Sequence, residues 1–129
     1  MSIEEYGRDE FSRQSFYRYQ YSADEGKTWT MTDDDTYSYK FDSKGNLISI
    51  ESKDNINDAV MGVEYEYNDS NICVLESDYA VEEETKIYFE KRIYDYKQED
   101  NYRTETTTAY YIEGDEEEFV YKDIYFYFV

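Results

Sequence analysis

The chain has no histidine, no proline and a single cysteine among its 129 residues. Without histidine it lacks the commonest general base and metal ligand, which excludes Ser–His and Cys–His catalytic pairs and histidine zinc sites. The lone Cys73 excludes an intrachain disulfide and lies in an apolar strand pattern. Phosphate-binding glycine motifs are also missing. We therefore expect a protein that is not an enzyme, with no cofactor and no metal site.

Long apolar runs are absent as well. No run approaches the ~18 residues of a membrane span, and Met1–Glu5 shows neither the cationic nor the apolar region of a secretory signal. We expect a cytoplasmic protein without membrane contact. The length predicts one domain over residues 1–129.

Acidic residues and tyrosine are what the chain has in excess. There are 32 acidic against 13 basic residues, a net charge of −19, and 18 tyrosines with 7 phenylalanines. Acidic disordered chains are poor in aromatics, so this one is expected to fold. Its field repels nucleic acid and anionic membranes and attracts cationic surfaces. The composition predicts a basic protein as partner and no direct binding of nucleic acid.

Alternation of aromatic and polar residues dominates the sequence, for example in Tyr17–Tyr21, Tyr37–Phe41 and Val63–Tyr67. In a strand this period places the aromatics on one face. The predicted strands are 15–22, 27–32, 36–42, 46–52, 62–68, 71–79, 85–97, 102–112 and 118–128. Short turn-rich joins between them predict an all-β fold, an antiparallel meander of about nine strands, as a twisted open sheet or a closed barrel.

The first 14 residues have a different pattern. Ser2–Glu5 fits a helix capping box, and Ile3, Tyr6 and Phe11 fall on one helical face. This pattern predicts a short N-terminal helix over 1–14, with a loose N-terminus as the alternative, and the β-meander over 15–129.

Two hairpins repeat weakly, and two segments resemble known hairpin motifs. Residues 39–52 are similar to 65–77, where the turn reads as one residue shorter. Ser22–Trp29 resembles the Asp-box of sialidase-like propellers, which implies that Ser22 and Asp24 bond within a turn above Trp29. Tyr39–Ile48 resembles the YD repeat of Rhs-type shell proteins. Both resemblances imply β-hairpins, and in the Asp-box families the motif is structural.

Successive turns of a meander alternate between the two ends of the sheet. The turns near 24–26, 43–45, 69–70 and 98–101 are predicted at one end, and the joins 33–35, 53–61, 80–84 and 113–118 at the other. Turns at one end follow each other at roughly 10 Å, a spacing comparable with that of phosphates. The acids of the second set form a predicted partner-binding rim: Asp33, Asp34, Asp35, Asp54, Asp58, Glu82, Glu83, Glu84, Asp115, Glu116, Glu117 and Glu118.

In size, charge and lack of catalytic residues the chain resembles the small acidic phage proteins that counter host defences, such as anti-CRISPR and anti-restriction proteins. The resemblance implies an inhibitor, in the host cytoplasm, that mimics nucleic acid and blocks a basic nuclease or a CRISPR or restriction effector. Two alternatives stay open: an immunity protein that neutralises a basic toxin, and a glycan- or surface-binding β module. Phe119–Val129 is apolar on both faces, as a central strand, a helix-covered strand or a homodimer contact would be.

Overall fold

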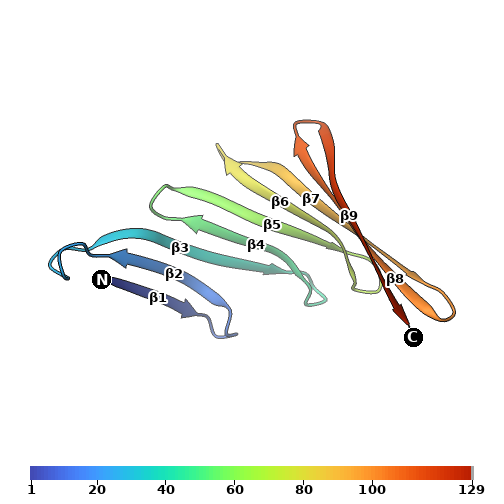
Figure 1. The fold of residues 1–129 in the computed structure, drawn as a ribbon, viewed down its shortest axis with the longest axis horizontal. Helices are drawn as coiled ribbons and strands as arrows, with labels where there is room; N and C mark the ends of the chain where they lie inside the picture. The colour runs from blue at the N-terminus through green and yellow to red at the C-terminus, as the bar shows by residue number, and fades with distance from the viewer. Residues whose placement is uncertain (129) are drawn as a thin grey trace.

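The protein is a single open antiparallel sheet in the computed structural model, which describes residues 1–128 (Figure 1). Each strand pairs with its neighbours in sequence, and β1 and β9 are the two edges. The strands are β1 (Ser2–Arg8), β2 (Gln14–Tyr21), β3 (Thr30–Phe41), β4 (Leu47–Asp54), β5 (Ala59–Tyr67), β6 (Cys73–Glu82), β7 (Thr85–Gln98), β8 (Tyr102–Glu113) and β9 (Glu116–Phe128). The predicted meander is confirmed, in its open form.

The predicted N-terminal helix is wrong, because residues 2–8 form strand β1 and residues 1–128 contain no helix. In β1, Tyr6 lies opposite Tyr17 of β2. A helix of so few residues is marginal in water. Pairing with the long β2 satisfies the same backbone groups and adds contacts between aromatic side chains.

Strand β3 corrects a second prediction, because it joins the predicted strands 27–32 and 36–42 into one. The predicted join at Asp33–Asp35 is therefore strand, and Asp34 lies opposite Arg18 of β2. An ion pair of 3.0 Å between these two side chains offsets the poor strand propensity of aspartate. The missed β1 and the divided β3 cancel in the strand count, so every later turn keeps its predicted end.

The two ends of the sheet differ in the turns that they carry. We call the end with turns 22–29, 55–58, 83–84 and 114–115 the acidic end; the opposite end carries 9–13, 42–46, 68–72 and 99–101. The predicted joins 53–61, 80–84 and 113–118 do meet at the acidic end. The turn near 24–26 also lies there, contrary to prediction.

Three turns at the opposite end share one five-residue structure. In each, the amide of the first residue donates to the carbonyl of the fifth, and the amide of the fourth donates to the carbonyl of the first. The side-chain oxygen of the first residue accepts from the amides of the third and fifth. The first residues are Asp9, Asp42 and Asn68, and the fourth are Ser12, Gly45 and Asn71, with φ of 63°, 86° and 60°.

This shared geometry sharpens the internal repeat. The turns of the two predicted copies have equal length, so the one-residue difference read from the sequence is wrong. A third copy of the turn joins β1 to β2, where the sequence pattern predicted a helix. Three of the four turns at the opposite end of the meander therefore repeat one structure.

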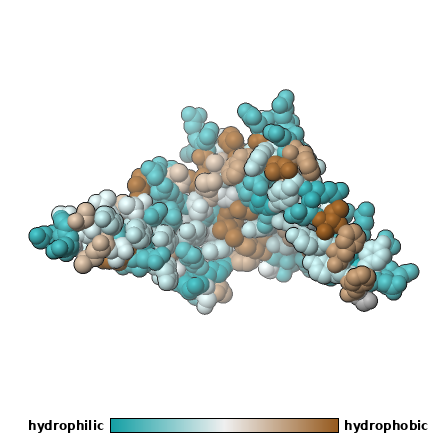
Figure 2. Space-filling model, in the orientation of Figure 1, coloured by the Kyte–Doolittle hydropathy of each residue, from teal (hydrophilic) through white to brown (hydrophobic). Residues whose placement is uncertain are grey.

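The sheet has no second layer among the described residues. Tyr79 and Ala109 are their only buried hydrophobic side chains. Tyr79 lies over Gly62, where a Cβ would stand 2.4 Å from its ring. The exposed area is 9539 Å², against about 7,300 Å² for a compact protein of 15.7 kDa. On the side seen in Figure 2, hydrophobic residues reach the surface over the middle of the sheet, among hydrophilic ones. Both faces are open for binding.

Candidate binding surface

Strand alternation and register place 14 of the 18 tyrosines on one face of the sheet. Tyr17, Tyr37 and Tyr65, for example, point to the same side of β2, β3 and β5. We call this side the tyrosine face. Its tyrosines are Tyr6, Tyr17, Tyr19, Tyr21, Tyr37, Tyr39, Tyr65, Tyr67, Tyr94, Tyr96, Tyr111, Tyr121, Tyr125 and Tyr127.

The strand lysines all lie on the other side, which we call the lysine face. They are Lys40, Lys53, Lys86, Lys91, Lys97 and Lys122, and Arg18 joins them. Several are paired with acids: Lys86 bonds Glu64 at 2.5 Å, and Lys91 pairs with Glu117. Acidic and basic side chains therefore largely balance on the lysine face.

The tyrosine face has no such balance. Its strand bases within residues 1–128 are Arg92, Arg103 and, two residues after Tyr6, Arg8 at the end of β1; Arg103 pairs with Glu105 at 3.3 Å. Its strand acids are Glu4, Asp33, Asp35, Asp54, Glu76, Asp78, Glu82, Glu90, Glu105, Glu113, Glu116, Glu118 and Asp123. The excess negative charge of the strands is thus concentrated on the face that also carries the tyrosines.

Arg92 is held by three carboxylates at the centre of the tyrosine face. Its guanidinium lies 2.6 Å from Glu76, 3.0 Å from Asp78 and 2.9 Å from Glu90. Burial alone would lower the pKa of Arg92, but the bonds and charges of Glu76 and Asp78 raise it above its ordinary value. The Tyr94 hydroxyl donates to Glu76, and burial and this bond raise the pKa of Tyr94 to about 12. Arg92 of β7 therefore links β7 to β6 and also binds Glu90 of its own strand.

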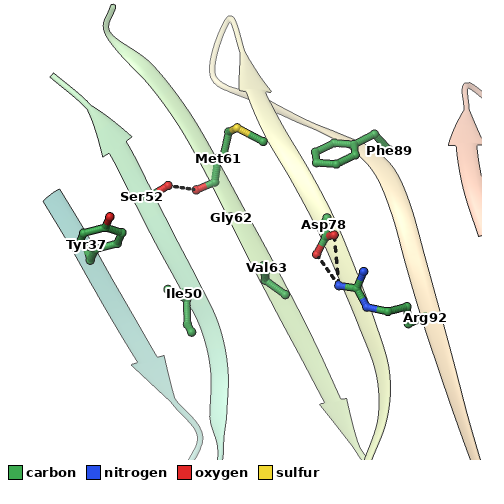
Figure 3. Close-up of a pocket in the computed structure, with 9 residues that line it drawn as sticks. All are labelled: Tyr37, Ile50, Ser52, Met61, Gly62, Val63, Asp78, Phe89 and Arg92. Atoms are coloured by element: carbon green, nitrogen blue, oxygen red, sulfur yellow. Dashed lines mark hydrogen bonds and ion pairs between the residues drawn. The ribbon is translucent and has the colours of Figure 1, made fainter. Parts of the chain in front are cut away.

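An open depression of about 380 Å³ lies beside this cluster (Figure 3). Figure 3 shows Asp78 and Arg92 bonded at one side of it, with Phe89 next to them. Tyr37, Ile50 and Val63 line the rest. Its lining is mostly apolar, and its two charged groups, Asp78 and Arg92, bond each other.

The predicted partner-binding residues divide between the two faces and the turns. Asp33, Asp35, Asp54, Glu82, Glu116 and Glu118 lie on the tyrosine face near the acidic end, and Asp58, Glu83, Glu84 and Asp115 lie in its turns. Asp34 and Glu117 point to the lysine face, where Arg18 and Lys91 pair with them. The structure thus brings most of the predicted set together at the acidic end and places two of its members on the lysine face.

Two members of the set hold the local fold. The Asp54 carboxylate accepts bonds from the Asn57 side chain at 2.7 Å and from the amides of Ile56 and Asn57, which lowers its pKa. Asp58 lies 3.2 Å from Lys53. Asp54 also faces Asp35 across β3 and β4, and burial together with the charge of Asp54 raises the pKa of Asp35.

The β6–β7 turn holds two glutamates in a backbone conformation that is unfavourable for residues with a side chain. Glu83 and Glu84 have φ of 49° and 64°. Two-residue hairpin loops with both φ positive ordinarily carry Asn-Gly or Gly-Gly. A residue with a Cβ in this region costs about 1–2 kcal/mol. The turn therefore places two carboxylates at the acidic end against the preference of the backbone.

The Ser22–Trp29 segment forms a tightly bonded turn at the same end. Ser22 Oγ donates to Asp24 at 2.9 Å, and the Thr28 hydroxyl and amide donate to Asp24 at 2.5 and 2.8 Å. The bonds from Thr28, followed by the one from Ser22, lower the pKa of Asp24 to about 2. Its side chain therefore serves the turn, and the family resemblance of this segment stays a prediction.

Sequence reasoning missed the tyrosine face as an acidic surface, since it placed the acids only in joins. Acids within strands, such as Glu4, Glu76 and Asp123, were not singled out. The signal was present in the dipeptides Tyr39-Lys40, Tyr96-Lys97 and Tyr121-Lys122. Adjacent strand residues face opposite sides, so each dipeptide separates a tyrosine from a lysine.

No family model and no curated protein matches the sequence. A solved structure, that of a DUF3836 family protein from Parabacteroides distasonis, is similar with a TM-score of 0.52 and 15% identity. The match covers 75% of this chain and 90% of that chain. At this identity the likeness concerns the fold alone. Within residues 1–128, no helix is long and apolar enough to cross a membrane, and no three acidic or cysteine side chains are grouped to hold a metal ion.

Proposed function

We propose that this protein is an acidic, non-catalytic binding protein that holds a basic partner on its tyrosine face and acidic end. The observation that carries the proposal is the separation of charge between the faces. Lysines and their partner acids occupy one side, whereas the strand acids of the other side outnumber its arginines, Arg8, Arg92 and Arg103. A cationic partner gains electrostatic energy from the tyrosine face and little from the lysine face.

The tyrosines supply the contact area for such a partner. Tyr21, Tyr111 and Tyr125 are 49%, 52% and 54% exposed beside acids of the same face. Tyrosine gives large contact area at a small cost in side-chain entropy, and its ring attracts lysine and arginine by cation–π interaction. Carboxylates would speed and orient the encounter, and tyrosines would hold the complex.

The partner that we propose is a nucleic-acid-binding protein, such as a nuclease or a CRISPR or restriction effector, whose basic groove is blocked. Acidic turns at 55–58, 83–84 and 114–115 follow each other along one end of the sheet. Turns two strands apart are roughly 10 Å from each other. Such a row of carboxylates supports mimicry of a phosphate backbone. The protein would therefore act as an inhibitor.

A capture experiment tests this function. The protein, immobilised, is exposed to native host lysate at low and at high salt, and captured proteins are purified. We expect a basic nucleic-acid-binding protein that is released as salt rises and displaced by added DNA or RNA. The control is a variant in which Glu82–Glu84 and Asp115–Glu118 are replaced by lysine. The proposal is contradicted if the amount of captured partner does not change with salt or with added nucleic acid, or if the variant captures as much as wild type.

A further inference from the structure

We infer that strand β9 is a self-association edge, and that two copies of the chain join antiparallel, β9 against β9, about a two-fold axis. This inference concerns the C-terminal edge of the sheet and is independent of the proposed function.

Strand β9 is a long apolar edge. Every residue from Glu116 to Phe128 is exposed. Phe119, Ile124 and Phe126 expose 58%, 48% and 66% of their surface. Within residues 1–128 no strand pairs with the outer side of β9. A long exposed strand with apolar side chains on both faces is a template for pairing with another chain.

The other edge has the features that prevent such pairing. Strand β1 has only seven residues and an irregular register at Gly7/Arg8. It carries Glu4 on one face and Glu5 on the other. Short length, irregularity and charge are the devices by which natural sheets protect their edges. Because only one edge is open, self-association ends at a dimer rather than continuing as a filament.

Charge and area favour a second copy as the occupant. Phe119–Phe128 contains one base, Lys122, and one acid, Asp123, so this segment has no net charge in a chain of −19. Pairing through this segment therefore adds no like charge at the contact itself. A stable interface buries about 800 Å² from each partner. The 9539 Å² exposed by this chain exceeds the area expected for its mass by more than that, about 2,200 Å².

The arrangement has a consequence for binding. Antiparallel pairing about an axis normal to the sheet keeps like faces on the same side. The two tyrosine faces then form one continuous surface, which would hold two sites of a partner at once.

Light scattering after size exclusion, over a range of protein concentrations, tests the inference with two matched variants. Ile124→Lys places a charge at the centre of β9. Ile3→Lys makes the same change on β1, where Ile3 is 41% exposed. We expect twice the monomer mass for wild type and for Ile3→Lys, and the monomer mass for Ile124→Lys with an unchanged circular dichroism spectrum.

A wild type that stays monomeric, or grows into larger polymers, overturns the inference, as does an equal effect of both variants. Should Ile124→Lys not fold, hydrogen exchange on wild type replaces it. We then expect the amides of β9, and not those of β1, to gain protection as concentration rises. Protection of β9 that does not change with concentration contradicts the dimer.

Discussion

The two faces of the sheet use charge in opposite ways. On the lysine face, bases and acids meet in pairs such as Lys86–Glu64 and Arg18–Asp34. On the tyrosine face, Arg92 alone serves three carboxylates, and acids such as Glu4, Glu82 and Glu118 have no basic partner within residues 1–128. Within the strands, the unbalanced charge therefore lies on one side of the sheet, the side on which we propose that a cationic partner binds.

The comparison also explains how so acidic a chain folds as one layer. Repulsion is spread along a wide sheet, and Arg92 relieves it among Glu76, Asp78 and Glu90. Removing a charged side chain should therefore change the free energy of unfolding differently on the two faces.

The largest effect is expected on replacing the central cation of the tyrosine face. Arg92→Met leaves Glu76, Asp78 and Glu90 without a base around a side chain that is only 22% exposed. Unpairing of a partly buried ion cluster should lower the free energy of unfolding by about 2–3 kcal/mol. Urea denaturation followed by circular dichroism measures the difference.

The matched change on the other face is Lys86→Met. It breaks the pair with Glu64, but the Lys86 side chain is 43% exposed. Exposed pairs contribute little, so a loss of about 0.5 kcal/mol or less is expected. Equal losses for the two variants would show that the faces do not differ in this way.

A smaller effect, of opposite sign on the two faces, is expected at two adjacent aspartates of β3. Asp35 lies opposite Asp54 on the tyrosine face, and Asp34 pairs with Arg18 on the lysine face. Like charges directly opposite are destabilising, so at neutral pH Asp35→Asn should stabilise by about 0.5 kcal/mol. Asp34→Asn should destabilise by about the same amount. Thermal melts of the two variants measure both.

The pH dependence of Asp35 gives a further check on the same pair. Its pKa is raised in the folded state, by burial and then by Asp54. The folded state therefore binds the proton more tightly, and protonation removes a cost that is present at neutral pH. The advantage of Asp35→Asn should fade as pH falls through the folded pKa of Asp35. An advantage that persists at low pH would contradict the repulsion.

Much of the fold could be predicted from the sequence because alternation and turn residues are local signals. They located β2 and β4–β9 within a few residues. These local signals failed at β1, because Ser2–Glu5 also fits a helix cap. Only the pairing with β2 decides between helix and strand there. They failed again at Asp33–Asp35, where the cross-strand partner Arg18 keeps the chain extended.

The candidate surface was harder to predict because it depends on register. Counting strands assigned the turn acids to one end of the sheet. That assignment survived because the missed β1 and the divided β3 cancel in the strand count. Which strand acids share a face with the tyrosines follows only from pairs such as Tyr19–Asp33 and Tyr111–Glu118. The position of Asp34 and Glu117 on the lysine face could not be predicted for the same reason, since their ion pairs lie across strands.

The central claim is that a basic partner binds the tyrosine face. Two triple variants with the same change of charge compare the faces directly. The first, Asp33→Asn with Glu82→Gln and Glu118→Gln, changes exposed acids of the tyrosine face; the second, Asp95→Asn with Glu5→Gln and Glu66→Gln, changes exposed acids of the lysine face.

The decisive measurement is the affinity of both triple variants for the purified basic partner at low salt. The account predicts that the tyrosine-face variant binds about tenfold more weakly than wild type, and that the lysine-face variant changes by less than about twofold. Equal weakening of the two variants would mean that net charge, and not the tyrosine face, determines binding, and would contradict the account.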